Sequence, residues 1–75
     1  MTHSDARQAV NQNLIDAGCD SALIVQYFSL EALGKPSNQM ALLAAHRKAL
    51  LDQIHQLQKA LDCLDYLINK LKKER

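Results

Sequence analysis

The chain is poor in the residues that β-sheets, tight turns and disulfide frameworks require. Its 75 residues include two Gly, one Pro, two Tyr, one Phe and no Trp. Most of the apolar residues are Leu, Ala or Ile, which together favour helices over strands. We therefore expect an all-α fold, and a chain of this length has room for a single domain over residues 1–75.

An excess of charge of one sign is also absent. Nine Lys and Arg stand against eight Asp and Glu, which gives a net charge of +1. This balance argues against a protein that coats nucleic acid through its phosphates, because such proteins are strongly basic. Apolar residues make up 48% and charged residues 23%, which is typical of folded rather than disordered chains.

Cysteine patterns and targeting segments are missing too. Cys19 and Cys63 form neither a CxxC metal-binding pair nor the dense pattern of a secreted disulfide scaffold. No basic segment followed by an apolar core opens the chain, and no apolar run is long enough to span a membrane. These features predict a soluble, cytoplasmic protein with reduced thiols and no membrane association.

Residues for catalysis or metal binding are few and poorly spaced. A zinc site needs three or four convergent ligands, and the sequence contains no HxxxH or CxxC pair. We therefore expect no enzymatic activity, no cofactor and no metal. The candidates weighed for a metal site are His3, His46, His55, Cys19 and Cys63.

Two short helices are predicted within the segment 1–34. Thr2 or Ser4 is expected to cap the first, which ends before Gly18, where a left-handed cap is common. The second covers residues 22–33 and ends at Gly34. It carries so many apolar residues that we expect burial on most of its circumference.

One long helix is predicted over residues 36–73, because Pro36 suits its first turn and no Gly or Pro follows. Numbered as heptads from Met40, nine of the ten a and d positions are apolar, and Arg47 is the exception. Five successive heptads of this kind predict a coiled coil. The a positions are Met40, Arg47, Ile54, Leu61 and Ile68, and the d positions are Leu43, Leu50, Leu57, Leu64 and Leu71.

The long helix exceeds the size of its own domain. About 37 helical residues span roughly 55 Å, whereas a compact globule of this length is about 30 Å across. Leaving half of the seam in water would forfeit roughly 1.5–3 kcal/mol per apolar side chain. We expect a second copy of the chain, in a homodimer, to cover it.

The sequence features that indicate whether the two chains run parallel or antiparallel disagree. Ile at a with Leu at d is typical of parallel two-stranded coils. In favour of an antiparallel coil, apolar residues at the flanking e and g positions widen the seam enough for additional helices. These residues are Ala44, Leu51, Ala60 and Leu67.

Two apolar groups off the seam bear on the same question. The chain's own short helices are expected to pack on a strip of Leu42, Ala45 and Ala49 in the first half of the long helix. A second cluster lies near the other end, where only an antiparallel partner brings its short helices. This cluster consists of Cys63, Tyr66 and Leu67.

A specific antiparallel alignment uses every seam position. If residues whose numbers sum to 111 face each other, every a position meets a d position. Arg47 then lies beside Asp65 of the partner subunit, with His46 nearby, and such a polar pair can fix the alignment at some cost in stability. The predicted dimer interface consists of Met40, Leu43, Arg47, Leu50, Ile54, Leu57, Leu61, Leu64, Asp65, Leu67, Ile68 and Leu71.

The two short helices and their Gly-containing turn have the outline of a DNA-binding helix-turn-helix. A recognition helix presents Arg, Lys, Asn or Gln to the base edges. The second helix offers only Gln26 among apolar neighbours. We therefore expect no specific DNA binding by this chain.

The runs NLIDAGCDSALIVQYFSLE and LLAAHRKALLDQIHQLQKALDCLDYLINKL resemble the C-terminal dimerisation region of MerR-family transcriptional regulators. The resemblance covers about residues 12–72, and the chain is most similar to short, stand-alone bacterial proteins of this type. It implies an antiparallel coiled-coil homodimer in which the helices before the coil pack against the partner's coil.

Two departures from that family limit what the resemblance implies. The family's winged-helix DNA reader precedes this region, and here only about a dozen residues precede it. The family's metal sensors have a Cys at the start of the coil and a Cys-containing loop after it. This coil begins Ser37-Asn38-Gln39 and the chain ends Lys-Lys-Glu-Arg.

Two functional hypotheses follow from these patterns. The first is a non-enzymatic dimerisation module, a regulator that pairs with itself or with a full-length MerR-like protein. The second is a small-ligand or thiol stress sensor that uses the groove between the coil and the short helices, with Cys19 or Cys63 as the sensing thiol.

Overall fold

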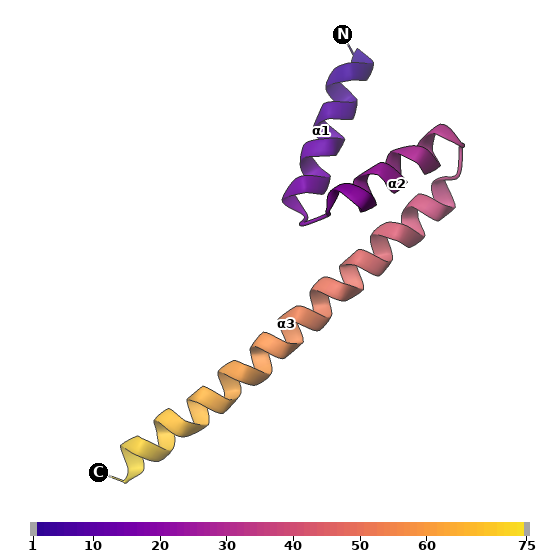
Figure 1. Cartoon of the computed structure of the whole chain (residues 1–75). Coiled ribbons are helices and arrows are strands. Elements are labelled where there is room, and N and C mark those ends of the chain that lie inside the picture. Colours follow the sequence, from indigo (N-terminus) through magenta and orange to yellow (C-terminus); the bar gives the residue numbers. More distant parts are fainter. Residues whose placement is uncertain (1, 75) are drawn as a thin grey trace.

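The computed structural model describes the backbone of residues 2–74 and the side chains of residues 6–74. Three helices account for nearly all of this range: α1 over Thr2–Asp16, α2 over Ser21–Ala32 and α3 over Pro36–Lys73. No strand occurs among the described residues. The predicted all-α fold, with two short helices before a long one, is confirmed (Figure 1).

The turn between α1 and α2 closes as the glycine pattern predicts. Gly18 has φ +80°, a left-handed conformation that glycine adopts without a steric penalty. The Cys19 amide donates to the Leu14 carbonyl at 3.0 Å, and the Gly18 amide donates to the Ile15 carbonyl at 2.9 Å. These two bonds form a Schellman motif, in which the flanking apolar pair commonly packs together. That pair, Leu14 and Cys19, supplies the two buried side chains of the described chain.

The second turn repeats this arrangement. Gly34 has φ +66°, and the Lys35 amide donates to the Leu30 carbonyl at 3.0 Å. Pro36 then occupies the first turn of α3, where its missing N–H leaves no helical bond unmade. At the start of α2, the Asp20 carboxylate accepts a hydrogen bond from the Leu23 amide at 2.9 Å. The predicted caps of α1, Thr2 and Ser4, have side chains outside the described residues.

Figure 1 shows α2 running back beside the first turns of α3, and α1 meeting α2 at an angle at the turn between them. We call α1, α2 and residues 36–51 the head, and residues 52–74 the shaft. The chain measures 66 × 25 × 16 Å, and its radius of gyration is 19.7 Å, against about 11 Å for a compact chain of this length. The prediction that α3 extends beyond its own domain is confirmed.

The prediction that α2 is buried on most of its circumference is wrong for the chain by itself. No residue of α2 is buried, and Val25 is 65% exposed. Only α1 and the beginning of α3 lie against α2, and two short contacts cannot cover all sides of a helix. The half-buried residues are Leu23, Ile24, Tyr27, Phe28 and Leu30.

The strip of α3 that faces the short helices also differs from the prediction. Leu42 is half-buried as expected, but Ala45 and Ala49 are exposed. Gln39 and His46 are half-buried in their place. The three half-buried residues are three and four positions apart, which puts them on one face of the helix. The short helices thus cover Gln39, Leu42 and His46 in part and leave Ala45 and Ala49 exposed.

No helix in the described part of the chain is both long enough and apolar enough to cross a bilayer.

Candidate dimer interface

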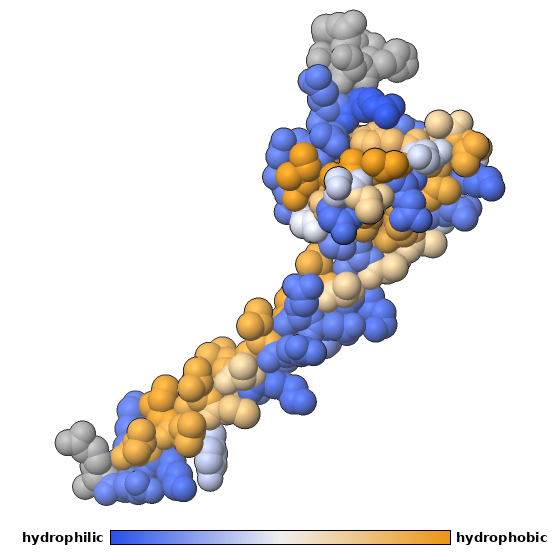
Figure 2. Space-filling model, viewed as in Figure 1, coloured by the Kyte–Doolittle hydropathy of each residue, from blue (hydrophilic) through white to orange (hydrophobic). Residues whose placement is uncertain are grey.

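The predicted seam residues of the shaft form one continuous apolar stripe that is open to solvent. Every residue from 52 to 74 is exposed, and Leu57 has 71% of its surface accessible. Figure 2 shows this stripe along the shaft toward the C-terminus. Contiguous apolar surface of this extent is rare on monomers and marks interaction sites. The residues of the stripe are Ile54, Leu57, Leu61, Leu64, Ile68 and Leu71.

The first half of the seam borders the head. Met40 is 70% exposed, whereas Leu43 and Leu50 are each 36% exposed. Leu43 also lines a groove between α3 and the short helices, with a volume of about 300 Å³. We call this the seam groove; its other lining residues are Val10, Asn13, Leu14, Ala17 and Tyr27.

Two hydrogen bonds attach the head's short helices to α3. The Gln39 side-chain amide donates to the Tyr27 carbonyl at 3.3 Å. The His46 Nε2–H donates to the Ala17 carbonyl at 2.8 Å, at the C-terminal end of α1. A helix end leaves carbonyls without partners, so this bond satisfies one of them. The two donors are two helical turns apart, and they fix the short helices along the beginning of α3.

His46 has a role within its own chain that the sequence did not indicate. The antiparallel alignment predicts His46 near Asp65 of the partner subunit, and in the single chain its Nε2 atom is hydrogen-bonded to the Ala17 carbonyl. Arg47, the next residue, is exposed, as is Asp65. The one salt bridge among the described residues joins Lys48 to Asp52 at 3.3 Å, so neither Arg47 nor Asp65 has an intrachain ionic partner there.

The predicted apolar cluster near the end of α3 is fully open. Tyr66 is 66% exposed and Leu67 is 53% exposed. Cys63 is an exposed free thiol, in contrast to the buried Cys19. Tyr66 also borders a shallow depression of the helix surface together with Asn69, Lys70 and Lys73.

The two ends of the molecule carry opposite charge. The segment 1–34 holds one basic and four acidic residues, a net of −3, and the remainder holds eight basic and four acidic residues, a net of +4. Asp16, Asp20 and Glu31 are exposed on the head. The last turns of α3 carry Lys70, Lys72 and Lys73, which also suit the negative end of the helix dipole.

The residues weighed for metal binding do not form a site in the described part of the chain. Among its His, Cys, Asp and Glu side chains, no group of three could hold a metal ion. The side chain of His3 lies outside the described residues. His46 is committed to its bond with Ala17, and His55 is exposed on the shaft.

Sequence reasoning missed the polar contacts that assemble the head. Gln39 and His46 lie on the same face of α3 as the apolar Leu42, and that spacing is the one signal that could have found them. Arg7 is placed over the ring of Phe28, with 4.3 Å between the guanidinium carbon and the ring centroid. Nothing in the sequence spacing indicates this pair, because it depends on how α1 crosses α2.

Replacing His46 with Ala should loosen the head without affecting the shaft. Loss of the bond to the Ala17 carbonyl is expected to cost about 1 kcal/mol of unfolding free energy. In hydrogen exchange, the amides of Gly18 and Cys19 should become less protected than in the parent chain. His55→Ala is the matched control, since His55 is exposed on the same helix. Equal losses in the two variants would contradict this role for His46.

Comparison of the chain with protein-family models, with curated proteins and with solved structures gave no match. The MerR-family resemblance therefore stays a prediction, and the case for a function is built on the geometry of the seam, the head and their charges.

Proposed function

We propose that the chain is a non-enzymatic dimerisation module in which two copies associate through the seam of α3 as an antiparallel coiled coil. The observation that carries this proposal is the apolar stripe of the shaft, which extends from Ile54 to Leu71 without cover from its own chain. Burying each such side chain stabilises an assembly by roughly 1.5–3 kcal/mol. A second copy supplies a matching stripe of the same length.

The alignment in which facing residue numbers sum to 111 supports an antiparallel arrangement. It places the central pair, Ile54 and Leu57, at the two-fold axis and uses all ten seam positions. Arg47 then comes beside Asp65 of the partner subunit, and both side chains are exposed in the single chain. The complete set of facing pairs is Met40 with Leu71, Leu43 with Ile68, Arg47 with Leu64, Leu50 with Leu61 and Ile54 with Leu57.

The same alignment gives the open surfaces of the head a counterpart. Leu43, which lines the seam groove, faces Ile68 of the partner subunit. The partner's Leu67 and Tyr66, which are exposed in the single chain, come level with that groove. An antiparallel dimer would therefore bury both the groove and the apolar cluster, whereas a parallel dimer would leave both in water.

Charge complementarity favours the same direction. An antiparallel partner brings its basic end, with Lys70, Lys72 and Lys73, beside the acidic head. A parallel partner would place the two acidic heads side by side and the two basic ends side by side. At physiological ionic strength, charges interact over about 8 Å, so the alignment of facing groups matters. The Ile-at-a pattern of parallel coils describes zippers without flanking helices, and this seam has flanking helices.

In its cellular role, the module acts by assembly rather than by reading DNA. The exposed residues of α2 include Gln26, but no Lys, Arg or Asn accompanies it on that helix. The resemblance to the dimerisation region of MerR-family regulators supports a role in transcription regulation, through pairing with itself or with a MerR-like protein. We assign this role to the cytoplasm.

Ile54→Asp should convert the dimer into a monomer. The substitution places two carboxylates near the two-fold axis of the seam, where burial of an unpaired charge is strongly unfavourable. Sedimentation equilibrium at micromolar concentration should give twice the chain mass for the parent protein and the single chain mass for the variant. Gln56→Asp adds the same charge two residues away, outside the a and d positions, and should remain dimeric. A well-folded monomeric parent chain would contradict the proposal.

Charge reversal at the two ends should report the direction of the chains. Glu31→Lys and Lys73→Glu each place like charges together in the antiparallel dimer and should raise its dissociation constant roughly three- to tenfold at low salt. The double variant restores opposite charges and should recover most of the affinity. All these differences should shrink at 1 M salt. Additive losses in the double variant would argue against contact between the head and the opposite end.

A further inference from the structure

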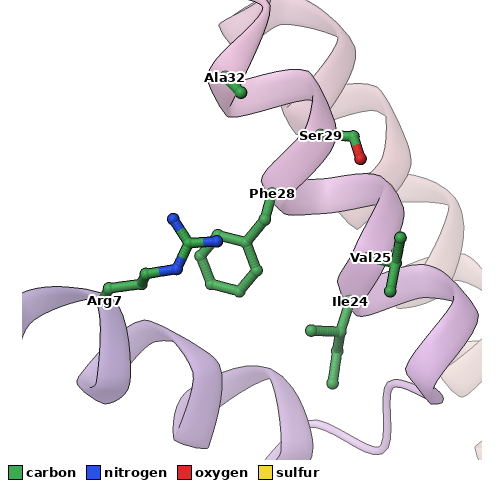
Figure 3. A pocket seen from close by; sticks show the side chains of 6 residues that line it. All are labelled: Arg7, Ile24, Val25, Phe28, Ser29 and Ala32. Atoms are coloured by element: carbon green, nitrogen blue, oxygen red, sulfur yellow. The ribbon is translucent and has the colours of Figure 1, made fainter. Parts of the chain in front are cut away.

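The head carries a second groove, on the side of α2 that faces away from α3. It is shallow and open to solvent, with a volume of about 360 Å³. Figure 3 shows its lining, which comes from α1 and α2 and includes no residue of α3. We call it the Arg7 groove; its lining residues are Arg7, Ile24, Val25, Phe28, Ser29 and Ala32.

Arg7 is held in place at one wall of this groove. Its guanidinium carbon lies 4.3 Å from the centroid of the Phe28 ring, and Figure 3 shows the group beside the ring. The Phe28 ring is itself fixed by an edge-to-face contact with Tyr27, with ring centroids 5.2 Å apart. A guanidinium on an aromatic face is oriented by the ring and keeps its N–H donors at its edge.

The donors of Arg7 have no acceptor within the described side chains. Neither a salt bridge nor a hydrogen bond joins Arg7 to any residue from 6 to 74. It is also the one basic residue in the segment 1–34. The groove therefore presents one oriented cation, and a singly charged group that matches an Arg fork is a carboxylate.

The rest of the groove is apolar. Ile24 and Phe28 are half-buried in it, and Val25 is 65% exposed at its edge. The one other polar side chain of the lining is Ser29. A ligand that fits this surface combines a single carboxylate with an apolar body, because a second charged group would lie against apolar side chains without a partner.

The Arg7 groove stays open when two chains associate through α3. Tyr27 lines the seam groove with Leu43, whereas Val25 and Ala32 lie roughly on the opposite side of α2. A partner that covers the seam and the seam groove therefore leaves the Arg7 groove accessible. We propose that this groove binds a small organic monocarboxylate with an aliphatic or aryl body, independently of dimerisation.

Octanoate is a suitable probe, with octanol and octylamine as matched compounds that lack or reverse its charge. Titrated into the ¹⁵N-labelled full chain, octanoate should give saturable shifts in the Arg7 Nε–H and in the amides of Val25, Phe28 and Ser29. Octanol should bind about tenfold more weakly, since it keeps the apolar contacts and loses the charge-assisted bonds. Sedimentation in the same buffers shows whether the dimer persists, which separates this proposal from the dimerisation proposal.

Two variants test the groove from opposite directions. Arg7→Gln removes the cation and should weaken octanoate binding about tenfold. Val25→Glu leaves Arg7 in place and adds a carboxylate at an exposed position of the same groove, so it should weaken octanoate binding by repulsion without disturbing the fold. Lys48→Gln, which removes a cation on α3, should leave binding unchanged.

Several outcomes would overturn the proposal. These are shifts centred on the seam groove or the basic end of α3, equal binding of octylamine, or retention of binding in both Arg7→Gln and Val25→Glu. The proposal would also be overturned if no saturable shifts appeared either at 10-fold molar excess or at about 10 mM octanoate, because a ligand of this size should bind at these concentrations.

Discussion

The structure depends on a mismatch of length between the apolar seam of α3 and the helices that the same chain offers to cover it. The two short helices have 15 and 12 residues, and α3 has 38. They cover one face of its first turns, and the shaft is exposed along its whole length. Because burial of apolar surface stabilises proteins, this exposed seam supports the proposed association of two chains through α3.

Within that constraint, the head is held together by local geometry more than by a core. Two Schellman turns at Gly18 and Gly34 set the path of the chain, and the Gln39 and His46 bonds fix the short helices on α3. Leu14 and Cys19 are the buried side chains of the described residues. The head therefore has two open grooves: the seam groove, which Leu43 joins to the seam, and the Arg7 groove.

The parts of the fold that the sequence predicts are those with local causes. Gly18, Gly34 and Pro36 mark the helix ends to within two residues, and the heptads identify the exposed stripe of α3. The failures depend on tertiary geometry. Periodicity overestimates the burial of α2 and gives no sign of the Arg7–Phe28 contact. It also predicts that Ala45 and Ala49 pack against the short helices, whereas Gln39 and His46 are the half-buried residues there. Each of these depends on the crossing of the helices, which periodicity does not encode. The relative direction of two chains in a dimer likewise depends on contacts with the partner, and the heptad spacing alone gives only a set of possible alignments.

The distance between spin labels at position 69 in the two chains tests the antiparallel dimer most directly. Asn69 is exposed, uncharged and outside the a and d positions, and Cys63→Ser removes the competing exposed thiol. In the proposed alignment the two labelled positions are separated by about 40 Å along the coil. A parallel coil would bring them within about 20 Å of each other. A narrow distribution centred at about 40 Å is the predicted result, and one centred at about 20 Å or less would contradict the account.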